Sequence, residues 1–189
     1  MSQCFSNNTK DYLREFRFIL DDMIEEMTDA KLTDSISHNF IVQMIPHHDA
    51  AIRMSENLLR YTTDVALQNI ALNIVREQTE SIENMERILR RCSGESDSRQ
   101  CNYRYKRKTD EIMRDMFSRM SDAESTNSID CNFVREMLPH HMGAVCMCEN
   151  ALRYDVCDGL KPILRGIVSS QKKEIAQLRR LERRLGCAG

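Results

Sequence analysis

The chain has 189 residues, of which 41% are hydrophobic and 30% charged, and its net charge of −2 divides into −5 over residues 1–93 and +3 over residues 94–189. It has 6 glycines and 3 prolines, and the first glycine is Gly94. Because hairpins and sandwich corners need turn residues, the composition excludes an all-β fold for the first half, and it also excludes disordered, collagen-like and membrane-spanning chains. We therefore expect a soluble, all-α protein.

Apolar residues recur at the helical period in six segments, which predicts helices at roughly 9–30, 35–61, 64–91, 103–122, 129–154 and 159–185. Residues able to cap a first turn stand before three of them, namely Ser35 or Ser37, Thr63 or Asp64, and Ser128 or Asp130. Pro162 fits the first turn of the last helix. Pro46 and Pro139 fall inside the second and fifth segments, so we expect a kink or a break there.

The chain repeats itself at an offset of 93 residues. Residues 38–61 read HNFIVQMIPHHDAAIRMSENLLRY and residues 131–154 read CNFVREMLPHHMGAVCMCENALRY, with 13 of 24 positions identical. This predicts a tandem duplication: an N-terminal repeat (1–92), a polar linker (93–102) and a C-terminal repeat (103–189), packed as one unit. The second and third helices of both repeats would form an antiparallel four-helix bundle about a pseudo-twofold axis.

The densest chemistry is a Met-x-x-His-His motif followed by a second Met, present in both repeats. Its residues are Met44, His47, His48 and Met54, with the copy Met137, His140, His141 and Met147. At 100° per residue, both histidines of each motif lie on the apolar stripe that should face the core. Under the predicted symmetry, His47 and His140 face each other across the axis.

Neutral imidazole with thioether sulfur is a ligand set that favours Cu(I). Zinc is a poorer match, because the chain has no Cys2His2 spacing. A di-iron centre needs Glu three residues before each ligand histidine, and Met44 and Met137 stand there instead. Further candidate ligands are His38, its counterpart Cys131, and the inward-facing Cys148.

Two alternatives remain open at this point. In the first, the motif is ordinary core packing in a structural or interaction bundle, and the histidine nitrogens bond to protein groups. In the second, the chain is a ferritin-like metal-dependent oxidase, for which Glu77, Glu80 and Glu174 are the nearest candidate carboxylates.

The eight cysteines show no CxxC pair, and the first residues hold no apolar signal-peptide segment. We therefore expect free thiols and a cytoplasmic location, with export as the alternative if a signal sequence has been removed. The basic stretch at 104–108 reads as a solvated helical turn. No nucleic-acid or membrane partner is expected, and a protein partner or homo-oligomer remains open.

The motif resembles the family called domain of unknown function 305, a ferritin-like helical-bundle family. The resemblance includes Phe40 and Phe133, small Ala51 and Ala144, and a following helix with Gln78 or Gln171 between isoleucines. The chain departs from the family pattern at Ser37, where Asp is expected, and at Leu178, where Met is expected. The resemblance implies an exported protein with a helical-bundle fold. Some members of the family look like copper-binding proteins of metal homeostasis. We therefore expect a non-enzymatic, copper-binding bundle with no catalytic residue.

Overall fold

The computed structural model describes residues 4–92, 94 and 96–187. Over these residues the chain forms six α-helices: α1 (Asn7–Thr28), α2 (Ile36–Leu59), α3 (Val65–Cys92), α4 (Arg99–Ser121), α5 (Ile129–Ala151) and α6 (Leu160–Leu185). This confirms the all-α prediction, and no strand is present in the part of the chain that the structure describes.

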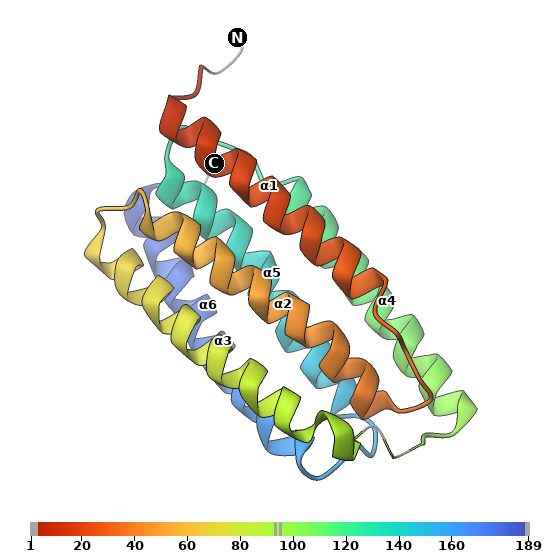
Figure 1. The fold of residues 1–189 in the computed structure, drawn as a ribbon. Helices are drawn as coiled ribbons and strands as arrows, with labels where there is room; N and C mark the ends of the chain where they lie inside the picture. Colours follow the sequence, from red (N-terminus) through yellow and green to blue (C-terminus); the bar gives the residue numbers. More distant parts are fainter. Residues whose placement is uncertain (1–3, 93, 95, 188–189) are drawn as a thin grey trace.

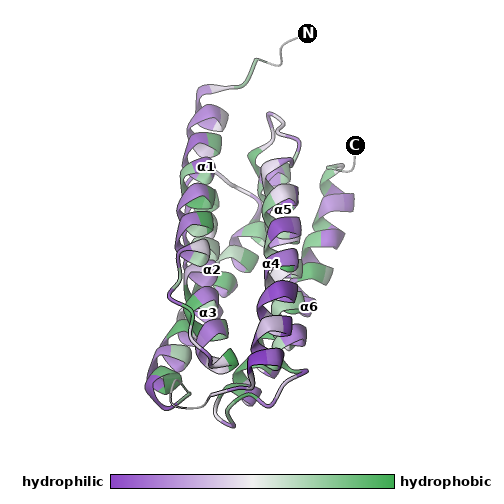
Figure 2. Cartoon of the chain, turned by 90° about the vertical axis from the view of Figure 1, so that its right-hand side faces the viewer, coloured by the Kyte–Doolittle hydropathy of each residue, from purple (hydrophilic) through white to green (hydrophobic). Residues whose placement is uncertain are grey.

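The helices form three layers of two, with α1 and α4 on one side, α2 and α5 in the middle, and α3 and α6 on the other side (Figure 1). The helices α2 and α5 run antiparallel and pack against each other, as do α3 and α6. Figure 2 shows hydrophilic and hydrophobic residues alternating along each helix, as expected for helices that bury one face. The two motif-bearing helices therefore lie at the centre of the molecule.

The predicted helix starts are correct at three of the caps. The side chains of Ser35, Asp64 and Ser128 each accept a hydrogen bond from the backbone N–H three residues later, at 3.2, 3.0 and 3.2 Å. The start of α4 differs, because it lies at Arg99 rather than near residue 103. The hydroxyl of Ser98 caps this helix at 3.3 Å, so the first turn of α4 takes the last four residues of the predicted linker.

Neither internal proline breaks its helix. Both α2 and α5 continue through Pro46 and Pro139, so of the expected kink or break the break is wrong, and the kink stays a prediction. Each proline removes a single N–H from the helical ladder. Both helices are covered by a layer on either side, and this packing holds the turns together.

Positions 93 residues apart make matching contacts. The side-chain amides of Asn57 and Asn150 donate to the carbonyl oxygens of Tyr12 and Tyr105 at 3.1 and 3.3 Å. The same two tyrosines stack edge-on against Tyr61 and Tyr154, with ring centroids 6.2 and 5.8 Å apart. The side chains of Asn39 and Asn132 accept from the N–H groups of Thr33 and Thr126 at 2.7 and 2.8 Å.

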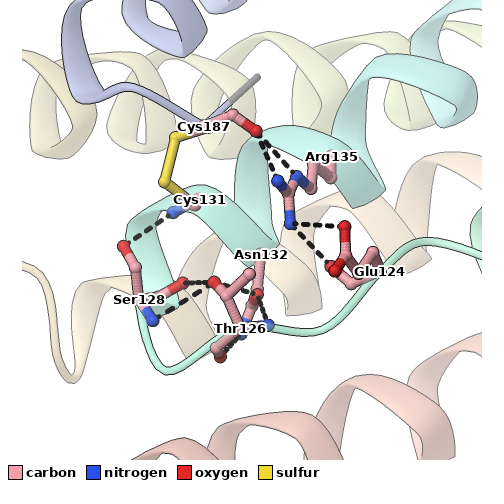
Figure 3. Close-up of polar contacts among 7 residues, drawn as sticks. All are labelled: Glu124, Thr126, Ser128, Cys131, Asn132, Arg135 and Cys187. Carbon is pink, nitrogen blue, oxygen red and sulfur yellow. Dashed lines mark hydrogen bonds and ion pairs between the residues drawn. A yellow bond between two sulfur atoms is a disulfide. The ribbon is translucent and has the colours of Figure 1, made fainter. Parts of the chain in front are cut away.

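Four of the eight cysteines form disulfides, which corrects the expectation of free thiols. Cys92 pairs with Cys157, and Cys131 pairs with Cys187, with Cα atoms 5.6 and 5.3 Å apart. The second bridge fixes the end of α6 to the first turn of α5, and Arg135, one turn further along α5, donates to the carbonyl of Cys187 (Figure 3). Helix termini thus bring together cysteines that lie far apart in the sequence.

The remaining thiols are exposed at Cys4, Cys101 and Cys146 and buried at Cys148. No helix in the described ranges is both long and apolar enough to cross a membrane.

Candidate metal centre

The centre of the molecule holds two histidines in face-to-face contact, as the predicted symmetry requires. The rings of His47 on α2 and His140 on α5 have centroids 3.7 Å apart and planes inclined by 30°. Each Nε2 atom lies beside the backbone carbonyl oxygen of the other histidine, at 3.2 and 3.0 Å. Both side chains are completely buried.

These contacts fix the protonation of both rings. A carbonyl oxygen only accepts hydrogen bonds, so each Nε2 atom must carry the proton and donate it. Burial holds the pKa of His47 and of His140 well below the ordinary value, and the neighbouring histidines lower it further. Both rings are therefore neutral, and each Nδ1 atom keeps an unprotonated lone pair. Neither Nδ1 atom has a hydrogen-bond partner.

One further histidine flanks each member of this pair. The Nε2 atom of His48 lies 3.1 Å from the hydroxyl oxygen of Ser81 on α3, and that of His141 lies 2.9 Å from Oε2 of Glu174 on α6. The second contact has the distance of an ion pair but not the direction of a hydrogen bond. Ser81 and Glu174 occupy equivalent positions of the two repeats.

Ring contacts link the four imidazoles in the order His48, His47, His140 and His141. Successive ring centroids are 6.0, 3.7 and 5.8 Å apart. All four side chains are at most 1% exposed, and all four Nδ1 atoms are buried without a hydrogen-bond partner. Burial, followed by repulsion from His141, lowers the pKa of His48 to about 3. We call these four residues the histidine row.

The motif methionines lie on the same two helices as the histidine row, at two separations along the chain. Met44 and Met137 precede His47 and His140 by three residues, which places each on the neighbouring turn of the same face. Met54 and Met147 follow the same histidines by seven residues, a rise of about 10 Å along the helix. All four side chains are at most 1% exposed.

Two of the three secondary ligand candidates do not join the row. Cys131 is bonded to Cys187, so its sulfur is unavailable and that prediction is wrong. His38 contacts the carbonyl oxygen of Lys31 at 3.1 Å, and it precedes His47 by nine residues, or about 13 Å of helix. Cys148 is buried as predicted, and burial raises the pKa of its thiol far above the ordinary value.

One of the three candidate carboxylates for an oxidase contacts a histidine of the row. Glu174 alone of the three candidates lies against a ring of the row, whereas Glu77 and Glu80 line a cavity between α3 and α6. Within the described residues, no three His, Cys, Asp or Glu side chains are grouped closely enough to hold a metal ion.

Two buried amides escaped the sequence reasoning as site residues. Gln78 and Gln171 are 3% and 2% exposed, and Gln78 has no partner for either of its amide atoms. Both line the cavity between α3 and α6, together with His48 and Glu174. Their recurrence at the same offset was visible in the sequence, but an isolated glutamine on a helix carries no signal for burial.

Comparison with known proteins assigns the family. The sequence model of the family described as "Domain of unknown function (DUF305)" matches residues 37–182. The chain belongs to this family. The match includes both Met-x-x-His-His motifs and all four helices that surround the histidine row.

Solved structures of a protein named CopM share the fold of this DUF305 chain. A silver-bound form obtained by soaking has a TM-score of 0.60 and 24% sequence identity, and the match covers 80% of this chain and 98% of CopM. The apo form has a TM-score of 0.59 at the same identity and covers 78% and 96%. No curated protein matches the sequence.

Proposed function

We propose that this chain is a non-enzymatic protein that binds a soft metal ion, with Cu(I) as its cargo, at the histidine row. The observation that carries the proposal is the set of four buried Nδ1 atoms without a partner. Leaving a buried acceptor unpaired costs about 1–3 kcal/mol each, so a fold that does this four times in one row needs a compensating ligand. A neutral imidazole nitrogen is such a metal ligand.

The residues fit a soft ion better than a hard one. His47 and His140 offer the central nitrogens, and Met44 and Met137 offer the nearest thioethers. His48 and His141 either bind the ion themselves or orient the residues that bind it. Met54 and Met147, seven residues further along each helix, shield the site. Imidazole and thioether together select Cu(I), whereas the single carboxylate of Glu174 is a poor basis for a hard-cation site.

The fold comparison supports the same class of ion. CopM has been solved with silver bound by two routes, soaking and co-crystallisation. Silver(I), like Cu(I), is a soft ion that favours sulfur and imidazole donors. The site residues proposed here rest on this chain's own geometry.

A purely structural bundle is the competing function, and one observation favours it. Each Nε2 atom of the histidine row already lies against a protein oxygen, as a packing role predicts. A packing role would also provide hydrogen-bond partners for the four Nδ1 atoms, but these atoms have none. This bundle predicts that the histidines stabilise the fold and that no soft ion binds to them.

We also infer that the chain arose by tandem duplication and that α2, α3, α5 and α6 form a ferritin-like four-helix bundle. The matching asparagine, tyrosine and histidine contacts at an offset of 93 residues support this. The repeats would correspond to 1–92 and 103–189, joined by the segment 93–102, and they would fold as one unit. The contact between His47 and His140 lies where the axis of such a duplication would pass.

The cytoplasmic location stays a prediction, and the disulfides favour the exported alternative. Structural disulfides persist in oxidising compartments and are rare in the reducing cytoplasm. Two bridges at helix ends, Cys92–Cys157 and Cys131–Cys187, are of this structural kind. We propose that the protein works where both bridges remain oxidised.

An anaerobic titration of Cu(I) against a chromophoric chelator tests the function. We expect the wild-type chain to bind with a Kd below about 1 µM, and the double variant His47→Leu plus His140→Leu to lose at least a hundredfold in affinity. Leucine fills the buried volume without a ring nitrogen, so the fold should survive, and far-ultraviolet circular dichroism checks this. His38→Leu, outside the row, is the matched control. Equal affinity in the double variant and the control, or no binding by the wild type, contradicts the proposal.

A further inference from the structure

A cavity of about 380 Å³ lies between α3 and α6. These two helices form the layer on the side of the molecule away from α1 and α4 (Figure 1). The described walls include His48 and Glu174. The cavity therefore reaches both ends of the histidine row, one end through His48 itself and the other through Glu174, which lies 2.9 Å from the Nε2 atom of His141. By contrast, the hollow between α4 and α5, lined by Met142 and Cys146, includes none of the four histidines.

The inner wall of the cavity carries polar atoms that no protein group satisfies. Gln78 lacks a partner for both amide atoms, and Gln171 and Glu174 each lack one for an oxygen atom. These side chains are 2–6% exposed. Buried oxygen atoms of this kind can bind water or a cation transiently, because no protein group donates a hydrogen bond to them.

The charge of the cavity suits a cation. Its described lining includes Glu77, Glu80 and Glu174 and contains no lysine or arginine. Arg76 lies 3.1 Å from the carboxylate of Glu77, so part of the negative charge is balanced at one edge. A cleft lined by one sign of charge raises the local concentration of the opposite ion.

The wall of the cavity formed by α6 contains a glycine. Gly166 lies inside α6 and lines the cavity, and a Cβ atom added there would meet no atom within 4 Å. Neither close packing nor backbone conformation requires glycine at this position. A side chain placed at this position therefore has room to extend across the mouth of the cavity.

We propose that the cavity between α3 and α6 is the access route by which a soft monovalent cation passes between water and the histidine row. The ion would leave its hydration shell against the oxygen atoms of Gln78, Gln171 and Glu174, and reach the row at His48 and His141. This inference rests on the proposed metal-binding function. It adds that the ion enters and leaves the histidine row through the cavity between α3 and α6.

The test is to narrow the mouth and measure rates separately from equilibrium. Cu(I)-loaded protein is mixed with an excess of chromophoric chelator in a stopped-flow instrument, and uptake is followed in the reverse experiment. We expect Gly166→Trp to slow both release and uptake at least tenfold, with Kd and stoichiometry unchanged. Gly166→Ala, which adds too little to obstruct the mouth, and Arg165→Trp, an exposed neighbour outside the cavity lining, are the controls and should exchange at the wild-type rate.

A second variant covers the case in which the tryptophan folds away from the mouth. Gln78→Leu plus Gln171→Leu removes the polar steps, and we expect it to slow exchange by a similar factor. Unchanged rates in both variants, or a change of Kd that accounts for the change of rate, overturn the access route. Absence of binding by the wild type at equilibrium is a separate result, because it overturns the proposed function and the access route with it.

Discussion

In the first repeat His48 lies beside the hydroxyl of Ser81, whereas in the second repeat His141 lies beside the carboxylate of Glu174. The central contact between His47 and His140 is, by contrast, nearly symmetric. The two halves of the chain thus make the same contact at the centre, between His47 and His140, and different contacts at the flanking histidines. This pattern is what the proposed duplication, with a central site shared by both copies, leads us to expect.

The starts of α2 and α5 differ in the same way. The start of α2 is held by hydrogen bonds, in which Asp97 accepts from the N–H of Ile36 at 2.7 Å and the hydroxyl of Ser35 donates to the carbonyl of Cys92 at 3.0 Å. The start of α5 is held by the Cys131–Cys187 disulfide and by Arg135 (Figure 3). In the first repeat, His38 stands at the position of Cys131.

Removing the disulfides, one of which holds the start of α5, should change the stability of the protein more than any other variant proposed below. The bridges join cysteines separated by 65 and 56 residues, and cross-links over such loops stabilise a fold by about 2–4 kcal/mol. We expect Cys131→Ser plus Cys187→Ser, and separately Cys92→Ser plus Cys157→Ser, each to lower the free energy of unfolding in urea by this amount. Because the two loops are similar in length, the losses should be similar.

A reductant gives the control for this prediction. Dithiothreitol should destabilise the wild type by the combined amount and leave a variant without the four cysteines unaffected. If reduction leaves the wild-type unfolding curve unchanged, the bridges do not contribute to stability.

A second asymmetry concerns the tyrosines of α1 and α4. The hydroxyl of Tyr12 donates to Oε2 of buried Glu136 at 2.6 Å, whereas the hydroxyl of Tyr105 lies against Thr109, and Gln43 stands at the position equivalent to Glu136. Burial raises the pKa of Glu136 to about 8, and the hydrogen bond from Tyr12 only partly opposes this. The carboxyl group is therefore protonated in the folded chain at neutral pH.

The sign of the resulting pH dependence follows from linkage. The unfolded chain loses the Glu136 proton near pH 4.5 and the folded chain keeps it to about pH 8, so the free energy of unfolding falls as pH rises between these values. We expect a loss on the order of 2 kcal/mol between pH 5 and 6.5, measured by urea denaturation. Glu136→Gln should flatten this dependence, while Glu111→Gln, on the surface of α4, should not. An equally steep profile in Glu136→Gln contradicts the assignment.

The helices and the central histidine pair follow from local rules and symmetry. Helical periodicity and the caps at Ser35 and Ser128 place α2 and α5, and a repeated motif on a buried stripe requires the two copies to meet. The partners of the row do not follow, because the contact of His141 with Glu174 depends on how α6 is rotated against α5. The disulfides do not follow either, since eight cysteines allow 105 complete pairings and only helix packing selects among them.

The contact between His141 and Glu174 gives the smallest expected effect and the most direct test of specialisation. A carboxylate beside the Nε2–H group makes the other ring nitrogen a stronger donor to metal, and loss of such a partner typically weakens metal binding 10- to 100-fold. We expect Glu174→Gln to raise the Kd for Cu(I) about tenfold, at the lower end of that range because Oε2 lies close to Nε2 without hydrogen-bond alignment. Ser81→Ala, the matched change in the first repeat, should raise Kd less than threefold, because a hydroxyl polarises the ring weakly. Equal shifts in the two variants would mean that the ends of the row are equivalent for metal, and that Glu174 differs from Ser81 for another reason.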